Sequence, residues 1–346
     1  MRRATSGTRG TGGVGKRPSG RGLARYGGRM TGTPEIAPVL PPADLPVDLR
    51  RVELLCAWLR PEEGVELERI SWAIGKRPRG EGWDNVLWPI GTLDGAPLVL
   101  RIARRRSSRA LLGREVTVLR RLRGLGTTLP MDLPRVIATA EDAVVVEWID
   151  GVTAAESDAA TQEQVAEDLA RMLATIHSGP APEVGRNPVR GVPLATRAEH
   201  FAADLDRAGL DDDAARRAAR TWQAGIDAEE WQGRELLLHG DPHPGNVVVP
   251  PPTSPGAVTL IDWGDTTRGD PASDLGALLL HPSSSWAGLL DVYRASAAWT
   301  GIEDDAIWEA LRARARAWAV RMALALVLVY PEGHSLGRIG RRLLAS

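Results

Sequence analysis

The sequence is poor in cysteine and contains no long apolar run. Cys56 is its only cysteine, so the chain can form no internal disulfide and has no set of thiolates for a zinc site. The longest apolar stretch, near residues 322–330, is far shorter than the ~20 residues that a membrane-spanning helix needs. The N-terminus is basic but lacks the apolar segment of a secretory signal. These absences predict a cytoplasmic protein with no membrane partner.

Acidic residues are missing from the first thirty positions, which hold eight basic side chains. The whole chain has 43 basic and 44 acidic residues, so the remainder carries 35 basic against 44 acidic residues, a net charge of −9. An acidic body argues against nucleic acid as the main partner, and it suits either solubility or a cationic small-molecule ligand. A DNA-binding regulator that used the basic N-terminus would leave the motifs described below without a role.

Large apolar residues are almost absent from residues 1–45, which are rich in Gly, Arg, Thr and Pro. Such a segment cannot bury enough surface to offset the entropy of ordering, so a disordered, basic tail is predicted there. Met30 is an alternative start of the native protein, a hypothesis that N-terminal sequencing would test. Residues 10–17, GTGGVGKR, approach the phosphate-binding loop pattern, but Arg17 replaces its hydroxyl residue and no apolar strand precedes them. We therefore do not expect phosphate binding in this tail.

Two regions of different periodicity follow the tail. Residues 46–147 contain helical and strand patterns, with Asp94-Gly95 as a tight-turn signal between two strands. Helices are expected at 47–59 and 111–122, and strands at 83–91, 96–103 and within 133–149. Residues 148–346 are mainly helical, at 162–177, 204–231 and from 272 onward, with short strands at 235–240, 246–249 and 257–264. We predict an α+β fold of two lobes, a small antiparallel-sheet N-terminal lobe and a mainly helical C-terminal lobe.

A polar loop separates two apolar runs in LLLHGDPHPGNVVV, residues 236–249. Its two histidines, His239 and His243, are four residues apart, a spacing that brings zinc ligands together only on a helix. Two prolines and a glycine within the loop oppose a helix, so zinc is not favoured. A turn in which Asp241 and Asn246 merely cap their neighbours is the simplest structural alternative.

The same loop fits the requirements of phosphoryl transfer, in which a carboxylate orients the attacking hydroxyl while metal ions and phosphates are held in place. The pattern His-x-Asp-x4-Asn supplies Asp241 as a base and Asn246 as an amide oxygen for a metal. Asp262, in the segment IDWG, follows sixteen residues after Asn246, which is the length of a hairpin. Strands of that hairpin would place Asp262 beside Asn246, so the three residues predict a metal-dependent phosphotransferase site.

LHGDPHPGNVVV and LIDWGDTTRGDPASDLG resemble, in order and spacing, the catalytic loop and metal-binding segment of the aminoglycoside phosphotransferase family. The similarity extends less strictly through GEGWDNVLWPIG, LVLRIARR, REVTVLRRL, VVEWIDG and LATIH, and covers roughly residues 80–340. This resemblance implies a protein-kinase-like two-lobe fold, with an N-terminal lobe at 46–147 and a C-terminal lobe at 148–346. It also implies ATP and Mg2+ as cofactors, and transfer of phosphate to a hydroxyl of a small molecule such as an aminoglycoside.

The resemblance assigns roles to single residues. Asp241 would be the catalytic base, and Asn246 and Asp262 would hold Mg2+. ATP would lie between the lobes against residues 145–149, which include Glu147 and Trp148. His239 would brace the loop, His243 receives no role, and the aspartates that follow the metal ligand would brace the metal loop or cap the next helix, namely Asp265, Asp270 and Asp274.

Arg101 stands where kinases of this fold carry a lysine that contacts the ATP phosphates, and Glu115 is its expected partner. Arginine is a planar group with several donors, so it can bind phosphate bidentately. A surface ion pair is the structural alternative for these two residues. GEGWDN, residues 80–85, lies where a loop would cover the phosphates, but it departs from Gly-x-Gly-x-x-Gly, so only a backbone contact is expected there.

The contrasting function is a catalytically silent nucleotide-binding protein of the same fold. Such a protein is expected to have lost a base or a metal ligand, whereas Asp241, Asn246 and Asp262 are all present. These motifs do not determine the identity of the acceptor, because substrate choice lies in helices outside them. The acidic stretch DLDRAGLDDD, residues 204–213, would attract a cationic acceptor, but a solvated helix face explains it equally well.

Overall fold

The computed structural model describes residues 40–126, 128–179, 183–253, 256–283 and 285–346. The predicted disordered tail lies outside this range up to residue 39, and so do Met30 and residues 10–17. Residues 40–45 lie on the first lobe instead. The amides of Asp44 and Leu45 both donate to the carbonyl of Arg104, at 3.1 Å, and Leu45 is buried.

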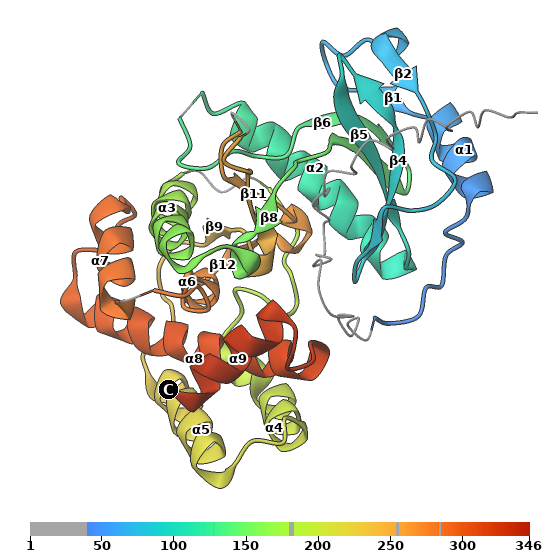
Figure 1. Ribbon diagram of the computed structural model, residues 1–346. Helices are drawn as coiled ribbons and strands as arrows, with labels where there is room; N and C mark the ends of the chain where they lie inside the picture. The colour runs from blue at the N-terminus through green and yellow to red at the C-terminus, as the bar shows by residue number, and fades with distance from the viewer. Residues whose placement is uncertain (1–39, 127, 180–182, 254–255, 284) are drawn as a thin grey trace, which may run out of the picture.

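The N-terminal lobe is a curved antiparallel sheet with two helices (Figure 1). Its strand order is β1-β6-β7-β5-β4-β2, with β3 paired to β4. The strands are β1 (Arg60–Pro61), β2 (Ile70–Trp72), β3 (Gly80–Glu81), β4 (Asn85–Leu93), β5 (Ala96–Ala103), β6 (Val136–Ala140) and β7 (Ala143–Glu147). The helices are α1 (Leu49–Ala57) and α2 (Arg109–Arg123), and α2 lies between the sheet and the helical lobe. The predicted strands and helices of this lobe are confirmed.

The turn between β4 and β5 has the backbone that its sequence predicts. Asp94 and Gly95 both have positive φ, at 50° and 87°, which is the conformation of the tight turns that join antiparallel strands. Leu93 pairs with Ala96 directly across the turn, so the register of the hairpin follows from it. Alternation along β5 then places Leu100 and Ile102 on the face toward α1, while Val99 and Ala103 face α2. Arg101 lies on this second face.

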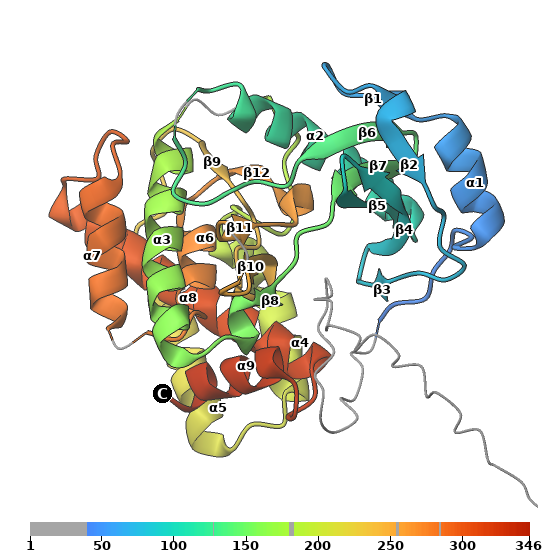
Figure 2. The ribbon, with the colours of Figure 1, turned by 45° about the horizontal axis from the view of Figure 1, so that its top comes forward.

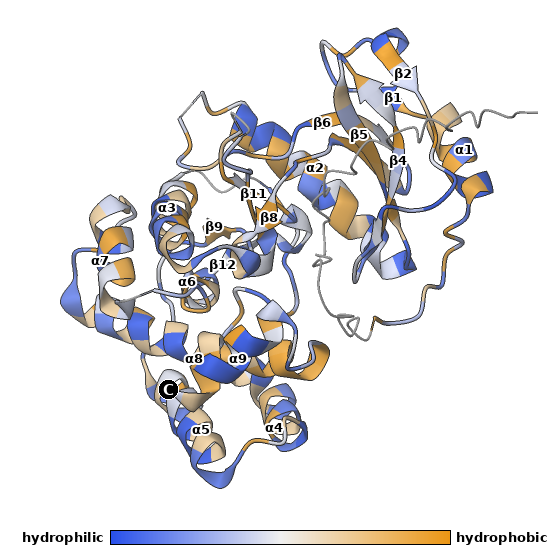
Figure 3. Cartoon of the chain, in the orientation of Figure 1, coloured by the Kyte–Doolittle hydropathy of each residue, from blue (hydrophilic) through white to orange (hydrophobic). Residues whose placement is uncertain are grey.

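The C-terminal lobe is mainly helical, and Figure 2 shows its longest helices around α6. Its helices are α3 (Ala159–Ser178), α4 (Ala198–Arg207), α5 (Asp212–Asp227), α6 (Ala272–Leu278), α7 (Trp286–Ser296), α8 (Asp305–Val329) and α9 (Ser335–Ala345). Helix α6 is buried along its whole length and packs against both α3 and α8. Figure 3 shows hydrophobic residues along the strands of the sheet and hydrophilic residues on the outer turns of α4 and α5.

Short strands cross the helical lobe and carry the polar segments. They are β8 (Val152–Thr153), β9 (Leu236–Leu238), β10 (Val247–Val249), β11 (Thr259–Leu260) and β12 (Thr267–Gly269). Val247 pairs with Leu260, so β10 and β11 form the predicted hairpin. The amide of Ile261 donates to the carbonyl of Asn246 at 2.9 Å, which brings the residue before Asp262 against Asn246.

The helical stretch predicted at 204–231 is two helices rather than one. Helix α4 ends at Arg207, Gly209 has a left-handed backbone with φ 62°, and the side chain of Asp211 caps α5 by accepting from the amide of Ala214. The acidic residues around this break serve as a cap or face solvent. Among the described residues, no helix is both long and apolar enough to cross a membrane.

Glycine is required at position 91, where β4 pairs with β2 and its register against β5 shifts at a bulge. Gly91 has φ 138°, and a Cβ there would lie 2.1 Å from the carbonyl oxygen of Ser71. We predict that Gly91→Ala lowers the free energy of unfolding by about 2–3 kcal/mol, measured by urea denaturation. Gly113 in α2 is the control, because its Cβ would meet nothing within 4 Å. Gly113→Ala should raise stability by about 0.5–1 kcal/mol, and equal stabilities of the two variants would contradict the prediction.

Candidate active site

The loop after β9 is anchored by a buried carboxylate from α6. Asp274 accepts from the backbone amides of His239, at 2.7 Å, and Gly240, at 2.9 Å. Its Oδ2 also lies 3.2 Å from Nε2 of His177 in α3, and both side chains are fully buried. Asp274 therefore braces the loop after β9, whereas the expected roles were to brace the metal loop or to cap the next helix.

His239 links this loop to the strand that leads to Asp262. Its Nε2 lies 3.1 Å from the carbonyl of Ile261, and its Nδ1 lies 3.2 Å from the amide of Asp241. A carbonyl accepts and an amide donates, so Nε2 carries the proton, Nδ1 accepts, and the imidazole is neutral. Burial lowers the pKa of His239 to about 4, consistent with that state. His239 is thus a brace of the loop rather than a group that exchanges protons near neutral pH.

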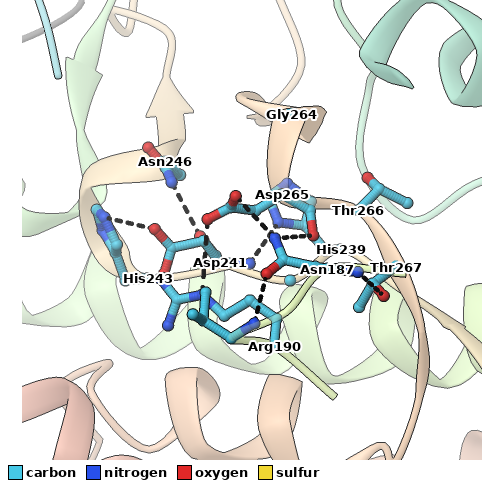
Figure 4. A network of polar contacts seen from close by, with 12 residues as sticks. Asn187, Arg190, His239, Asp241, His243, Asn246, Gly264, Asp265, Thr266 and Thr267 are labelled. Atoms are coloured by element: carbon cyan, nitrogen blue, oxygen red, sulfur yellow. Dashed lines mark hydrogen bonds and ion pairs between the residues drawn. The ribbon is translucent and has the colours of Figure 1, made fainter. Parts of the chain in front are cut away.

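Asp241 lies at the centre of a polar network (Figure 4). Its Oδ1 accepts from Nη2 of Arg190 at 2.8 Å, and its Oδ2 lies 3.7 Å from Nε2 of His243. Burial favours the neutral acid, but Arg190 and then His243 outweigh it, so the pKa of Asp241 is lower than usual. Its side chain keeps 24% of its surface exposed. Asp241 is thus an ionised, accessible carboxylate in a fixed orientation.

Asn246 completes the loop in the short 3-10 helix η5 (Pro244–Asn246). Its Nδ2 donates to the carbonyl of Asp241 at 2.9 Å. Because the two atoms of an amide lie on opposite sides, this bond turns Oδ1 away from that carbonyl and leaves it to face another ligand. The imidazole of His243, which had no predicted role, accepts from the amide of Gly245 at 3.0 Å and caps η5.

Asp262 follows β11 in a left-handed backbone conformation, with φ 65°. Arg101 from β5 binds it, with 3.3 Å between Nη2 and Oδ1, and also binds Glu115 of α2, with 2.5 Å between Nη1 and Oε1. Arg101 and Glu115 are 5% and 2% exposed, so the alternative of a surface ion pair is wrong. One guanidinium therefore connects the sheet, α2 and the residue predicted to bind metal.

The surroundings of Asp262 suit a cation. Burial at the junction of the lobes raises the pKa of its carboxyl to about 7; Arg101 opposes this rise, and Glu115 and Asp265 add to it. The side chain nevertheless keeps 52% of its surface accessible, so an ion can reach it. Carboxylate and amide oxygens such as those of Asp262 and Asn246 are ligands that Mg2+ accepts, with phosphate oxygens and water filling its other positions. Within the described residues no group of three or more His, Cys, Asp or Glu side chains could hold a metal ion by itself.

Glu147 and Trp148 lie at the end of β7, where the lobes connect. The Glu147 carboxylate pairs with Arg135 at 2.7 Å. The Trp148 amide donates to the carbonyl of Pro97 at 2.7 Å, and its ring lies 3.7 Å below the guanidinium carbon of Arg79. Both residues are thus held in place by β5, β6 and the segment before β3.

The GEGWDN strip forms the tip of the β3–β4 hairpin. The amide of Gly82 donates to the carbonyl of Asn85 at 2.9 Å, which closes the turn. Asp84 at the tip accepts from Arg105 and from the hydroxyl of Ser108, at 2.5 and 2.6 Å. Its negative charge also contributes to the raised pKa of Asp262 and Asp265, so the tip lies within electrostatic reach of the metal segment.

Arg190 and Asn187 belong to this site, although they were not identified as site residues from the sequence. Nε of Arg190 lies 3.6 Å from Oδ2 of Asp265, and the Asn187 amide donates to Oδ1 of Asp265 at 3.0 Å (Figure 4). Their irregular segment lies against β12, where a Cβ on Gly269 would be 2.1 Å from the carbonyl oxygen of Gly191. Because Arg190 precedes Asp241 by 51 residues and lies outside any periodic pattern, no local signal pointed to it.

A family model, described as the phosphotransferase enzyme family, matches residues 76–321. The chain belongs to this family. No curated protein matches it in sequence. The enzyme class predicted from the sequence, a small-molecule kinase, is confirmed by this membership.

Solved structures of phosphotransferases share the fold. A macrolide 2'-phosphotransferase type I is 21% identical, with a TM-score of 0.52 over 88% of this chain and 99% of that one. The GDP and kanamycin complex of APH(2")-IIIa is 15% identical, with a TM-score of 0.56 over 86% and 98% of the two chains. The streptomycin and ATP complex of APH(2")-IIa is 18% identical, with a TM-score of 0.50 over 85% and 95%. The predicted two-lobe, kinase-like fold is confirmed.

The role of Asp274 can be tested by stability. Asp274→Asn places an NH2 group among the donors of His239, Gly240 and His177, so we expect the free energy of unfolding to fall by about 2–4 kcal/mol. Thermal and urea unfolding measure it. The control is Asp213→Asn, because Asp213 pairs with Arg216 on the surface and its side chain is 76% exposed. That change should stay within about 0.5 kcal/mol, and a similar loss in both variants would refute the role.

Proposed function

We propose that this protein is an ATP- and Mg2+-dependent kinase that transfers the γ-phosphoryl group to a hydroxyl of a small molecule. The observation that carries the proposal is that an accessible, ionised Asp241 lies beside Asn246, and that Asn246 and Asp262 flank the paired strands β10 and β11 at the same end of one hairpin. Phosphoryl transfer needs these parts and little else, because its catalysis consists mainly of positioning and charge stabilisation. The shared fold with phosphotransferases whose structures contain GDP or ATP also supports the proposal.

Asp241 would orient the acceptor hydroxyl and take its proton as the new oxygen–phosphorus bond forms. Arg190 holds Oδ1 of this carboxylate, and Oδ2, which lies 3.7 Å from Nε2 of His243, would accept from the acceptor hydroxyl. The lowered pKa keeps Asp241 ionised at neutral pH, so no prior deprotonation is required. It also makes Asp241 a weak base, and orientation of the hydroxyl is then its main contribution.

Asn246 and Asp262 would hold Mg2+, whose charge offsets that of the phosphates when it is bound. Arg101 would contact the phosphates while Glu115 fixes its guanidinium from behind. ATP would lie against the segment that contains Glu147 and Trp148, beside the tip of the β3–β4 hairpin. Arginine serves here in place of lysine because two of its nitrogens can bind separate partners, as they do with Glu115 and Asp262.

The acceptors named for the neighbouring structures, macrolides and aminoglycosides such as kanamycin and streptomycin, form the first panel of compounds to test. The alternative function is a nucleotide-binding protein without transfer activity. The ionised state and accessibility of Asp241 favour the kinase, because a silent protein has no need to maintain either.

Asp241→Asn should lower acceptor-dependent release of nucleoside diphosphate from Mg-ATP by roughly 10²–10⁴-fold, because the hydroxyl loses its orienting carboxylate. Nucleotide affinity should change little, since Asp241 does not touch the proposed nucleotide site. The control is Asp213→Asn, whose turnover should equal that of the natural protein. Tight nucleotide binding without release in the natural protein, over a broad panel of hydroxyl compounds, would favour the silent alternative.

Affinity for Mg-nucleotide should rise with pH and level off above about pH 7. The Asp262 carboxyl, with its pKa of about 7, must lose its proton before it binds a cation. Below that pH, affinity should fall by up to about tenfold per pH unit. Calorimetric titrations at pH 6, 7 and 8 measure it. Asp262→Asn is the control, because its remaining pH dependence reports the titration of the nucleotide itself. The same pH dependence in this variant and in the natural protein would contradict the role of Asp262 as a metal ligand.

A further inference from the structure

Three arginines from separate elements lie close to one another in the neighbourhood of Asp241. Arg190 comes from the segment before η4 (Leu194–Arg197), Arg197 ends η4, and Arg321 lies in the last third of α8. η4 and α4 both pack against α8, which brings these positions together. The arginines lie within electrostatic reach of one another, and Arg190 and Arg321 within reach of Asp241.

Two of these arginines have no hydrogen-bond or ion-pair partner among the residues that the structure describes. Arg197 is only 7% exposed, yet it makes no hydrogen bond and no ion pair with any residue that the structure describes. Arg321 is half-buried and likewise lacks both within the described ranges; its guanidinium carbon lies 5.6 Å from the ring centre of Trp318 in the preceding turn. The Nε atoms of both are buried, and neither has an acceptor in the portion of the chain that the structure describes. Arg190 differs, because Asp241 and Asp265 bind it.

The acidic groups that face these arginines are already engaged. Asp241 and Asp265 are bound by Arg190, and Asp204, which lies near Arg197 and Arg321, pairs with Arg207 at 3.3 Å. The pKa of Arg321 is lowered to about 10, mainly by burial and also by Arg190 and Arg197, while Asp204 and Asp241 oppose the shift. The region is therefore short of negative charge.

A buried cation without a partner is costly, and the cost is recovered when an anion binds it. Guanidinium groups match carboxylate and phosphate oxygens in shape and donor number. We propose that the acceptor carries an anionic oxygen group, a carboxylate or a phosphate, that binds Arg197 and Arg321 while its hydroxyl faces Asp241. This inference rests on the proposed kinase function and narrows its substrate class. Polycations such as kanamycin are then poor acceptors, because the same arginines repel them.

Inorganic phosphate is the probe, titrated calorimetrically into protein saturated with Mg2+ and a non-hydrolysable ATP analogue, so that the nucleotide phosphates already occupy their own site. We expect phosphate to bind, and Arg197→Gln and Arg321→Gln each to weaken it about tenfold or more, the effect of losing one charged hydrogen-bond pair. Arg316→Gln is the control, because Arg316 is exposed on the same helix. Arg321→Lys should restore part of the affinity, which a merely structural role would not do.

Unchanged phosphate affinity in the Arg197 and Arg321 variants would overturn the proposal, and so would tighter binding of kanamycin than of phosphate. Thermal unfolding of each variant shows whether a loss of affinity reflects misfolding. If Mg-nucleotide failed to bind, the proposed kinase function would be refuted instead. Phosphate could then be titrated without nucleotide, which would still measure anion binding by Arg197 and Arg321. Acceptor-independent hydrolysis of ATP, present in the natural protein and lost in Asp241→Asn, tests the kinase machinery separately from acceptor choice.

Discussion

The candidate site depends first on the buried carboxylate of Asp274. It accepts from two consecutive backbone amides, those of His239 and Gly240, and so fixes the start of the loop that carries Asp241. The same carboxylate contacts His177, whose other ring nitrogen lies 2.8 Å from the hydroxyl of Tyr293, so the loop is tied to α3, α6 and α7 together. Gly240, with φ 93°, then allows the chain to pass Asp265 at a distance that no Cβ would permit. The loop is therefore held as rigidly as the helical core that surrounds it.

Arg101 connects the segment that carries Asp262 to the N-terminal lobe. It binds Glu115 within its own lobe and Asp262 in the other, and the hydrophobic core runs without interruption from Leu87 and Val99 to the helices of the second lobe. A lysine is a single point charge and would hold both carboxylates less well than the forked guanidinium does. Arginine at position 101 thus has a structural use of its own, because it joins carboxylates of the two lobes.

Charge is distributed in opposite senses on the surface and around Asp241. The acidic excess of the body includes residues 204–213, where Asp211 caps a helix and Asp213 forms a surface pair. Arginines instead lie beside the loop that carries Asp241, and two of them have no hydrogen-bond or ion-pair partner in the described part of the chain. The average charge therefore describes the surface, whereas the charge beside Asp241 depends on a few side chains whose sign is the reverse of that average.

The local pattern of the sequence determined the two-lobe architecture, the β4–β5 turn, and the grouping of Asp241, Asn246 and Asp262, because each depends on periodicity or on residues close along the chain. Asn246 and Asp262 are sixteen residues apart at the ends of two paired strands, so the hairpin largely fixes the position of Asp262. The break between α4 and α5 was missed because helical periodicity continues through Gly209, whose backbone ends the helix. Only the tertiary structure brought Arg190, Arg197 and Arg321 to Asp241. These residues come from segments far apart in the chain, and their contacts depend on how η4, α4 and α8 pack, which no local pattern specifies.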